Sequence, residues 1–244
     1  MTQSHIPTAV KGEEWYQEDS VAASYETKRF SRGGRLIDQR EKTAVLEALG
    51  PVEDRSVLDI ATGTGRFSLL LAEMGADVVG VDISRAMLEQ AEEKRRGANL
   101  AGMLSFFRGD ASNLPFADNS FDVVVAMRFF HLVDDAARFL KELKRVASEM
   151  VIFDTFKRYS FRSIYNWALP MGSQLVSSRE VEDWLEAAGL ELRAVVDDWI
   201  LPYGFYRSIP LAIARALRPL DARFVRLPGC NRLASVSYWS ATVD

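Results

Sequence analysis

VLDIATGTGRF, residues 57–67, is the stretch of this 244-residue chain that decides its fold. A short apolar run ends in a turn with two glycines, Gly63 and Gly65, and a helical pattern follows. Glycine adopts positive φ angles and lets a ligand approach the main chain. The free N–H groups at the start of the next helix point into the same space. The stretch therefore predicts a strand–turn–helix unit with a ligand site at the turn, and a tight turn without a ligand is the alternative.

Apolar runs and helical patterns keep alternating along the rest of the chain. Strands are expected at 56–60, 77–81, 103–107, 121–126, 149–154, 190–196 and 234–243, and helices at 39–49, 67–74, 84–96, 134–146 and 181–188. Ser84 is the expected N-cap of its helix. Strands that alternate with helices at this pitch imply right-handed βαβ units. We predict an α/β fold with a doubly wound, mostly parallel, seven-stranded Rossmann-like sheet.

The composition argues against several classes of protein. A formal net charge of -4 and a pI of about 5.4 give no overall positive field that would hold RNA or DNA. Cys230 is the single cysteine and the chain has two histidines, so we predict neither a disulfide framework nor a metal site. A reducing, cytoplasmic location fits this cysteine usage. No run approaches the roughly 18 apolar residues of a transmembrane helix.

Acidic residues close the first three expected strands. Asp82 can accept hydrogen bonds from both hydroxyls of a ribose, because an ionised carboxylate only accepts, and Ile83 can cover one face of an adenine. Asp110 can accept from the adenine amine while Ala111 offers its backbone N–H. Asp59 precedes the glycine turn, where it can meet an ammonium group. Each aspartate alone is more typical of a cap or turn, but in an open α/β sheet these strand ends gather at one crevice, which predicts a nucleoside site.

Four motifs make the chain resemble the class I S-adenosylmethionine-dependent methyltransferases, and their wording is closest to the ubiquinone and menaquinone methyltransferase branch. The motifs are LDIATGTG at 58–65, VGVDIS at 79–84 with Met87 and Leu88, RGDA at 108–111 with LPF at 114–116, and FDVV at 121–124 with FHL at 130–132. The resemblance implies adenosine over Asp82, Ile83, Asp110 and Ala111, the methionine part against Ala61, Gly63 and Gly65, and an antiparallel last strand. The chain departs from the family at RVASEM, 145–150, where relatives carry proline and glycines. The loop into the fifth strand is therefore expected to differ.

The full predicted cofactor site combines the residue patterns with this resemblance. Its members are Asp59, Ala61, Thr62, Gly63, Gly65, Asp82, Ile83, Met87, Asp110, Ala111, Met127 and Arg35. Arg35 is included because a guanidinium can clamp the cofactor carboxylate with two hydrogen bonds, and a solvated basic surface is its alternative. The implied cofactor is S-adenosylmethionine, with S-adenosylhomocysteine as the product.

Few residues are needed for the chemistry, because a sulfonium methyl group is already a strong electrophile. The protein must hold the nucleophile in line with the S–methyl bond, and it needs a base only if the nucleophile is protonated. His131 is the candidate base, since an unperturbed imidazole titrates near neutrality, with a packing role as the alternative. Tyr16 and Tyr25 are candidate substrate contacts, or residues that dock the N-terminal cap on the sheet.

We interpret the chain as one methyltransferase domain, 1–244, with an N-terminal cap at 1–40 and a cofactor-binding core at 41–154. The segments 155–178 and 202–232 lie outside the alternation and are rich in aromatic residues, arginine and proline. Long irregular connections are usually lids or binding elements, so we assign both to the substrate. Core packing, contact with a membrane surface and a homodimer interface are the alternatives for these segments.

The expected acceptor is a small or lipid-like molecule, apolar or aromatic. An RNA or protein methyltransferase is the alternative, although AMRF at 126–129 lacks the Asn/Asp-Pro-Pro-Tyr/Phe sequence with which many enzymes grip an amine. A dinucleotide-dependent oxidoreductase is disfavoured because Ser68 replaces the third glycine of the dinucleotide pattern. A binding protein that kept the cofactor pocket and lost catalysis stays open.

Overall fold

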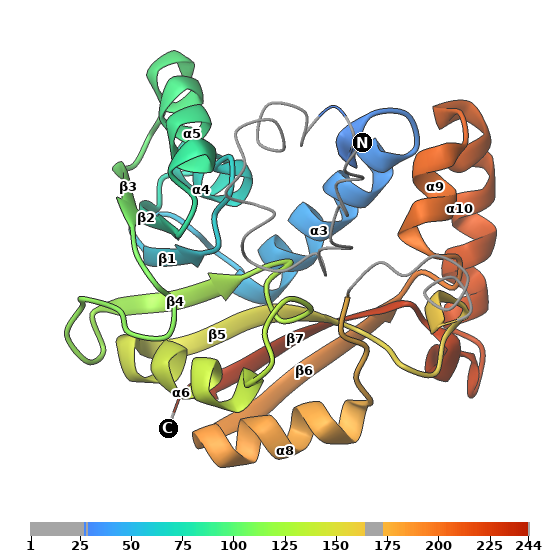
Figure 1. The fold of residues 1–244 in the computed structure, drawn as a ribbon. Coiled ribbons are helices and arrows are strands. Elements are labelled where there is room, and N and C mark those ends of the chain that lie inside the picture. The colour runs from blue at the N-terminus through green and yellow to red at the C-terminus, as the bar shows by residue number, and fades with distance from the viewer. Residues whose placement is uncertain (1–26, 28, 164–172, 244) are drawn as a thin grey trace, which may run out of the picture.

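The computed structural model describes residues 27, 29–163 and 173–243, and a seven-stranded sheet forms its centre (Figure 1). The strands are β1 Ser56–Ile60, β2 Asp77–Asp82, β3 Leu104–Arg108, β4 Phe121–Ala126, β5 Ala147–Phe156, β6 Leu190–Asp198 and β7 Val236–Val243. Their order in the sheet is β3-β2-β1-β4-β5-β7-β6. The pairs from β3 across to β5 are parallel, and β7 runs antiparallel to both β5 and β6. The predicted Rossmann-like sheet and its antiparallel last strand are confirmed.

Helices cover both faces of this sheet (Figure 1). They are α3 Gly34–Leu49, α4 Arg66–Glu73, α5 Arg85–Gly97, α6 Ala136–Val146, α8 Ser178–Ala188, α9 Tyr203–Ser208 and α10 Leu211–Val225, with the 3₁₀ turn η1 Cys230–Leu233. One core layer packs α3, α4, α9 and α10, and the other packs α6 and α8. Neighbouring β1 residues enter opposite layers, Val57 the first and Leu58 the second, as the alternation of a strand requires.

Local capping explains where two helices begin. The Ser84 hydroxyl accepts a hydrogen bond from the Met87 N–H at 3.3 Å, which confirms the predicted N-cap of α5. Ser177 and Glu180 form a capping box at α8, in which each side chain bonds the other residue's backbone N–H. Both helices are therefore set in register with the strands beside them.

The expected change at 145–150 is a direct passage from helix to strand. Helix α6 ends at Val146 and β5 starts at Ala147, with Ala147 serving as the C-cap. Relatives with proline and glycines at this point need a turn. In this chain the strand begins immediately, so the missing proline and glycines leave the sheet intact.

The prediction of an irregular connection at 202–232 is wrong, because this segment is largely helical. Pro202 and Pro210 stand at the N-cap positions of α9 and α10, where a proline interrupts no helix. Its aromatic residues also pack inward: Tyr203 and Tyr206 are almost wholly buried beside Trp199. A high content of aromatic residues, arginine and proline thus did not indicate an irregular connection, and core packing accounts for much of the aromatic content.

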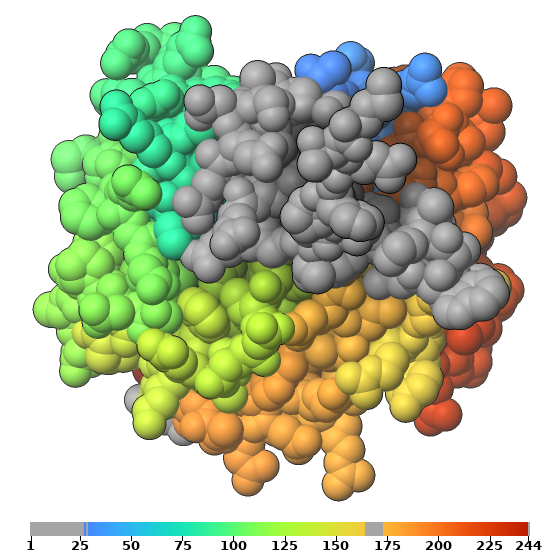
Figure 2. Space-filling view, in the orientation of Figure 1, coloured from blue at the N-terminus to red at the C-terminus, as the bar shows by residue number. Residues whose placement is uncertain are grey.

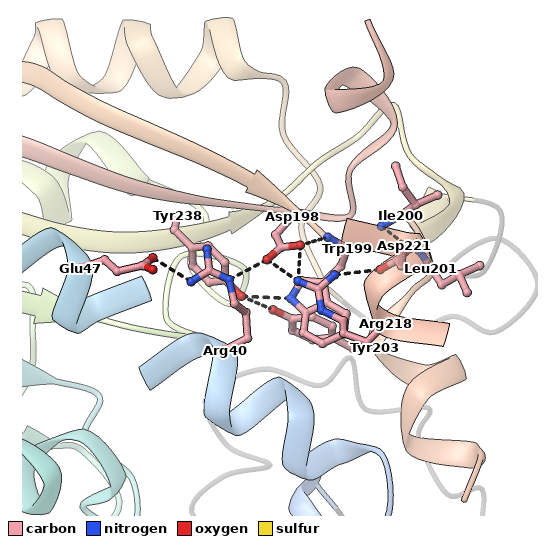
Figure 3. A network of polar contacts seen from close by, with 10 residues as sticks. All are labelled: Arg40, Glu47, Asp198, Trp199, Ile200, Leu201, Tyr203, Arg218, Asp221 and Tyr238. Carbon is pink, nitrogen blue, oxygen red and sulfur yellow. Dashed lines mark hydrogen bonds and ion pairs between the residues drawn. The ribbon is translucent and has the colours of Figure 1, made fainter. Parts of the chain in front are cut away.

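An ion network fastens these helices to the sheet (Figure 3). The Asp198 carboxylate, at the end of β6, accepts from Arg40 Nε of α3 at 2.7 Å and from an Arg218 terminal nitrogen of α10 at 2.6 Å. Asp221 of α10 accepts from two backbone N–H groups just after β6. The network joins three elements that are distant in sequence and fixes α10 at the edge of the molecule.

Candidate functional site

One cavity opens at the carboxyl ends of β1, β2 and β4 and beside the turn that follows β3. Nine of the twelve predicted cofactor residues line it: Ala61, Thr62, Gly63, Asp82, Ile83, Met87, Asp110, Ala111 and Met127. An apolar wall of Phe129, Leu132, Val133 and Phe139 continues the same cavity. Residues up to 78 positions apart in the chain, Ala61 and Phe139, therefore meet where an open α/β sheet binds its ligand.

The two glycines of the first turn have different physical roles. Gly65 has φ 77°, and a Cβ there would lie 2.9 Å from the ring of Phe106, so this glycine is required by packing. Gly63 has φ 59°, and a Cβ there would find its nearest neighbour at 3.9 Å, so its open side faces the cavity. Ala61 adds a non-glycine residue with φ 52° on the cavity wall. Backbone of this kind leaves room for a ligand against the main chain.

Asp59 lies behind the turn and does not line the cavity. Its Oδ2 accepts from the Thr62 hydroxyl at 2.7 Å, the Ser68 hydroxyl at 2.6 Å and the Ser68 N–H at 3.1 Å. Burial raises the pKa of Asp59 to about 6, although these hydrogen bonds oppose the change. The structure thus shows Asp59 shaping the turn, while its expected contact with an ammonium group, directly or through water, stays a prediction.

Asp82 lines the cavity and also holds two backbone segments. Its Oδ2 accepts from the Gly63 N–H and its Oδ1 from the Ser84 N–H, both at 2.8 Å. A carboxylate offers about four lone-pair sites, so each oxygen can accept one more hydrogen bond from a ligand hydroxyl. Burial raises the pKa of this carboxyl, while the backbone donors oppose the change. Asp82 therefore links the first turn to the start of α5.

Asp110 closes the far side of the cavity from an exposed turn. Its two oxygens accept from the Ser112 N–H at 2.8 Å and the Ser112 hydroxyl at 2.9 Å. The neighbouring Ala111 lines the cavity too. The arrangement presents one carboxylate and a short backbone segment to a ligand, as the sequence predicted for an adenine.

The arginines on the cavity wall differ from the one that we predicted. Arg35 is exposed on α3 and does not line the cavity. Arg66 and Arg128 do, and both bond the buried Glu41, at 2.6 and 3.4 Å. The sequence did carry a signal for each, because Arg66 directly follows the glycine turn and Arg128 lies two residues after the end of β4.

Arg128 stands in a strained backbone position beside a buried acid. Its φ is 64°, and its N–H donates to the Asp154 carboxylate in a short hydrogen bond. Burial raises the pKa of Asp154 to about 6, with the Arg128 charge opposing and Glu41 adding to the change. Two non-glycine residues with left-handed backbone, Ala61 and Arg128, thus follow β1 and β4 and line the same cavity. Such strain is characteristic of ligand sites.

His131 is buried just behind the apolar wall. Its side chain is 5% exposed, and its ring lies 4.9 Å from the ring of Phe156. Burial lowers the pKa of His131 well below its usual value, and four arginines, Arg128, Arg29, Arg162 and Arg207, lower it further. The imidazole is therefore neutral at pH 7 and is a weak proton acceptor. Tyr16 and Tyr25 lie outside the described residues.

An aromatic and basic group adjoins this wall, and it includes Phe156 and Arg162 of the segment 155–178 and Tyr203 of the segment 202–232, both predicted to contact the substrate. The Cζ of Arg162 lies 3.4 Å from the ring centre of Phe156, and the Cζ of Arg128 lies 4.7 and 5.1 Å from the rings of Phe156 and Tyr203. Arg162 is 6% exposed and has no acidic partner among the described residues. Burial lowers its pKa to about 9, with Arg128 contributing. Positive charge is thus concentrated beside the apolar end of the cavity.

The fold and this cavity are typical of α/β proteins that bind a ligand at the carboxyl edge of the sheet. The family model described as "Methyltransferase domain" matches residues 58–152. A demethylmenaquinone methyltransferase of Beutenbergia cavernae is 38% identical over 180 residues, which cover 69% of this chain and 71% of the relative. One of Porphyromonas gingivalis is 30% identical over 204 residues, covering 76% and 82%.

The solved structures agree on the fold. Magnesium protoporphyrin IX methyltransferase of Synechocystis PCC 6803 with bound S-adenosylhomocysteine superposes with a TM-score of 0.69, at 14% identity, covering 95% of this chain and 98% of that one. This chain belongs to the S-adenosylmethionine-dependent methyltransferases, in the branch that includes the menaquinone and ubiquinone methyltransferases. It is an enzyme that uses S-adenosylmethionine to methylate a small or lipid-like molecule.

Proposed function

We propose that S-adenosylmethionine lies in the cavity with its ribose on Asp82, its adenine between Ile83 and the Asp110–Ala111 turn, and its methionine part over Ala61 and Gly63. The observation that carries this proposal is the meeting of these residues in one cavity. Each has the chemistry for its part: acceptors for hydroxyls, an apolar side chain for the base and an open backbone for close approach.

We further propose that the acceptor is a quinol-type aromatic ring and that one of its carbons is methylated. The named relatives act on demethylmenaquinone, and the wall formed by Phe129, Leu132, Val133 and Phe139 suits a flat apolar molecule. A net charge of -4 disfavours a nucleic-acid acceptor, and a single cysteine fits a cytoplasmic enzyme.

S-adenosylmethionine, held by Asp82, Ile83 and the Asp110–Ala111 turn, would supply an electrophilic methyl group to the ring carbon and leave as S-adenosylhomocysteine with the electron pair of the broken S–C bond. The proton displaced from the ring carbon would pass to solvent water at the open end of the cavity. This chain's residues prepare the acceptor. The charges of Arg128 and Arg162 favour the ionised form of an acceptor hydroxyl, since an opposite charge nearby stabilises an anion. An ionised hydroxyl makes the ring carbon more nucleophilic. The apolar wall keeps water away from the sulfonium.

The neutral His131 is assigned a positioning role in this scheme. Because its pKa is well lowered, it accepts a proton poorly at pH 7. Its ring packs on Phe156, the same ring over which Arg162 lies. His131 therefore orients the aromatic group that holds the arginines, and acceptor ionisation takes the place of a strong base.

The test is methyl transfer from S-adenosylmethionine with a labelled methyl group to a short-chain demethylmenaquinol kept reduced by dithionite. We expect a product one methylene heavier, with the label on the ring carbon. The oxidised quinone is the matched control, since it is not nucleophilic and should gain no label. If the quinol stays unlabelled while label enters RNA or protein of a cell extract, the proposed acceptor is wrong.

Two variants assign the roles within this test. Asp82→Ala should weaken S-adenosylmethionine binding, measured by calorimetry, by about 1–3 kcal/mol, the scale of lost charged hydrogen bonds. Arg162→Met should leave that affinity unchanged and lower kcat for the quinol. Rising pH should restore part of the lost rate, because hydroxide ionises the acceptor. Equal losses in both measurements for Arg162→Met would place Arg162 on the cofactor.

A further inference from the structure

Helix α10 carries an apolar stripe that faces away from the rest of the protein. Ile213, Leu217, Leu220 and Phe224 recur at steps of four, three and four residues, which places them on one side of a helix. Ile213 is 50% exposed, Leu220 62% and Phe224 44%, and Leu227 just beyond the helix is 52% exposed. Ala214 and Val225, about 100° round the helix from this stripe, are buried against the core. A stripe of this kind on a folded protein is characteristic of a docking surface.

The same segment is strongly basic, although the whole chain is acidic. Residues 199–233 contain six arginines and one acidic residue, Asp221, against a net charge of -4 for the chain. Asp221 is buried and pairs with Arg218 on the inner side, so it neutralises nothing on the outer side. Four of the arginines are exposed: Arg215, Arg223, Arg226 and Arg232. None of these four makes an ion pair with any residue that the structure describes.

We infer that α10 and the turn after it dock on the surface of an anionic lipid bilayer. A helix lies in a membrane interface when an apolar side enters the acyl region and basic side chains reach the lipid phosphates. Arginine also suits this position because its apolar stem can follow the lipid while its charge stays in water. We call the apolar stripe of α10, Leu227 and the exposed arginines beside them the α10 surface.

Charge decides between a membrane and a second copy of this chain. A twofold contact through the α10 surface would bring the same arginines of both copies together, because such an interface is self-complementary. Like charges facing each other disfavour that contact. A bilayer with anionic headgroups offers the opposite charge along the whole row.

The position of α10 fits a lipid-like acceptor. In Figures 1 and 2, α9 and α10 form the right-hand margin of the molecule. The ion pairs of Asp198 with Arg40 and Arg218 hold α10 on the fold, so the surface is presented rigidly (Figure 3). Helix α9 connects it to the cavity, since Tyr203 lies 5.1 Å from the Arg128 guanidinium on the cavity wall. Docking would thus bring the acceptor end of the cavity near the membrane.

The test is co-sedimentation of the full chain with phosphatidylcholine vesicles, with and without an equal share of phosphatidylglycerol. We expect binding to the anionic vesicles only, weakened by added salt because surface charge is screened. The double variant L220E/F224E should lower vesicle affinity at least tenfold. Each of R223Q and R226Q should lower it about fivefold, as one charge near such a surface contributes about 1 kcal/mol. Met103→Glu, at a 71% exposed methionine before β3, is the matched control and should bind normally.

Each other outcome overturns the inference. Equal binding to neutral vesicles, or unchanged binding by L220E/F224E, removes the anionic membrane as the occupant. A dimer in light scattering that L220E/F224E converts to a monomer assigns the surface to a second copy. Vesicle binding needs no turnover, so this result is independent of the proposed acceptor. Methylation of a water-soluble short-chain quinol should be the same for L220E/F224E and the unmodified chain.

Discussion

At the scale of single residues, Asp82 shows why one side chain cannot be assigned one role. The sequence predicts it as the ribose acceptor, and the structure adds that it holds the Gly63 and Ser84 N–H groups. Replacing it with alanine therefore removes the proposed ligand contact and two supports of the cavity wall. Asp82→Asn keeps one acceptor oxygen, so it should lose less cofactor affinity than Asp82→Ala. Calorimetry with S-adenosylhomocysteine measures the difference, and equal affinities of both variants and the unmodified chain would remove Asp82 from the site.

His131 gives a prediction about pH. Its pKa in the folded chain is lowered by burial and by neighbouring arginines, whereas in the unfolded chain it titrates near 6.5. As pH falls below about 6.5, the unfolded state gains a proton that the folded state does not, so the fold loses stability by up to about 1.4 kcal/mol per pH unit. His131→Gln has no such loss. We therefore expect the difference in free energy of unfolding between the unmodified chain and His131→Gln, measured in urea, to shrink from pH 7 to about pH 5.

The buried aspartates do not affect the difference in stability between the unmodified chain and His131→Gln. Asp59 and Asp154 have their pKa values raised to about 6, so the folded state takes up their protons first and gains stability as pH falls through 6. This gain is present in both proteins and cancels in their difference. A constant stability difference across the range would show that His131 is not buried in its neutral form.

At the scale of elements, the two glycines of the turn from β1 into α4 serve different purposes, since Gly65 is required for packing and Gly63 faces the cavity. Gly65→Ala brings a Cβ within 2.9 Å of Phe106 at φ 77°, so we expect a loss of about 2–4 kcal/mol of stability from strain and overpacking. Gly63→Ala meets nothing nearer than 3.9 Å and should cost about 1–2 kcal/mol for its φ alone. The added methyl group of Gly63→Ala would occupy the cavity. We therefore expect Gly63→Ala to reduce cofactor affinity more than Gly65→Ala does. Denaturant unfolding and calorimetry on both variants check the pair, and the reverse order would contradict it.

The Asp198 network tests how the C-terminal helices are held. Asp198→Ala leaves Arg40 and Arg218 without their shared carboxylate, and breaking such a buried pair costs about 3 kcal/mol or more. Glu47→Gln is the matched control, because Glu47 also bonds Arg40 but is 61% exposed, and it should cost at most about 0.5 kcal/mol. Thermal unfolding measures both. Similar small effects would mean that packing of Trp199 and Tyr203, rather than the network, holds α10.

At the scale of the whole molecule, the sequence predicted best what depends on local periodicity. Strands β1, β2 and β4 and helices α4 and α5 were placed within one or two residues, because each is an apolar period followed by glycine, aspartate or a cap. The pairing of Arg40 with Asp198 joins residues 158 positions apart, so no local sequence pattern predicts it. The same holds for Arg162 on Phe156, where burial of a charged side chain is decided by tertiary packing. Helices α9 and α10 were missed because their segment was interpreted as an irregular connection, although Pro202 and Pro210 lie at the N-cap positions of the two helices.

Because one cavity gathers residues from four strand ends, ligand binding should stabilise the whole molecule. At about 100 times the dissociation constant a ligand adds about 2.7 kcal/mol, and a domain of this size gains about 2–4 °C per kcal/mol. S-adenosylhomocysteine should then raise Tm by about 5–10 °C, whereas NAD should not. Asp82→Ala at the same ligand concentration should shift by only about 2–3 °C, since a loss of about 2 kcal/mol in affinity lowers the ratio of ligand to dissociation constant to about 3, which adds only about 0.9 kcal/mol. If S-adenosylhomocysteine raised Tm equally in the unmodified chain and in Asp82→Ala, Asp82 would not contact the ligand that the cavity binds.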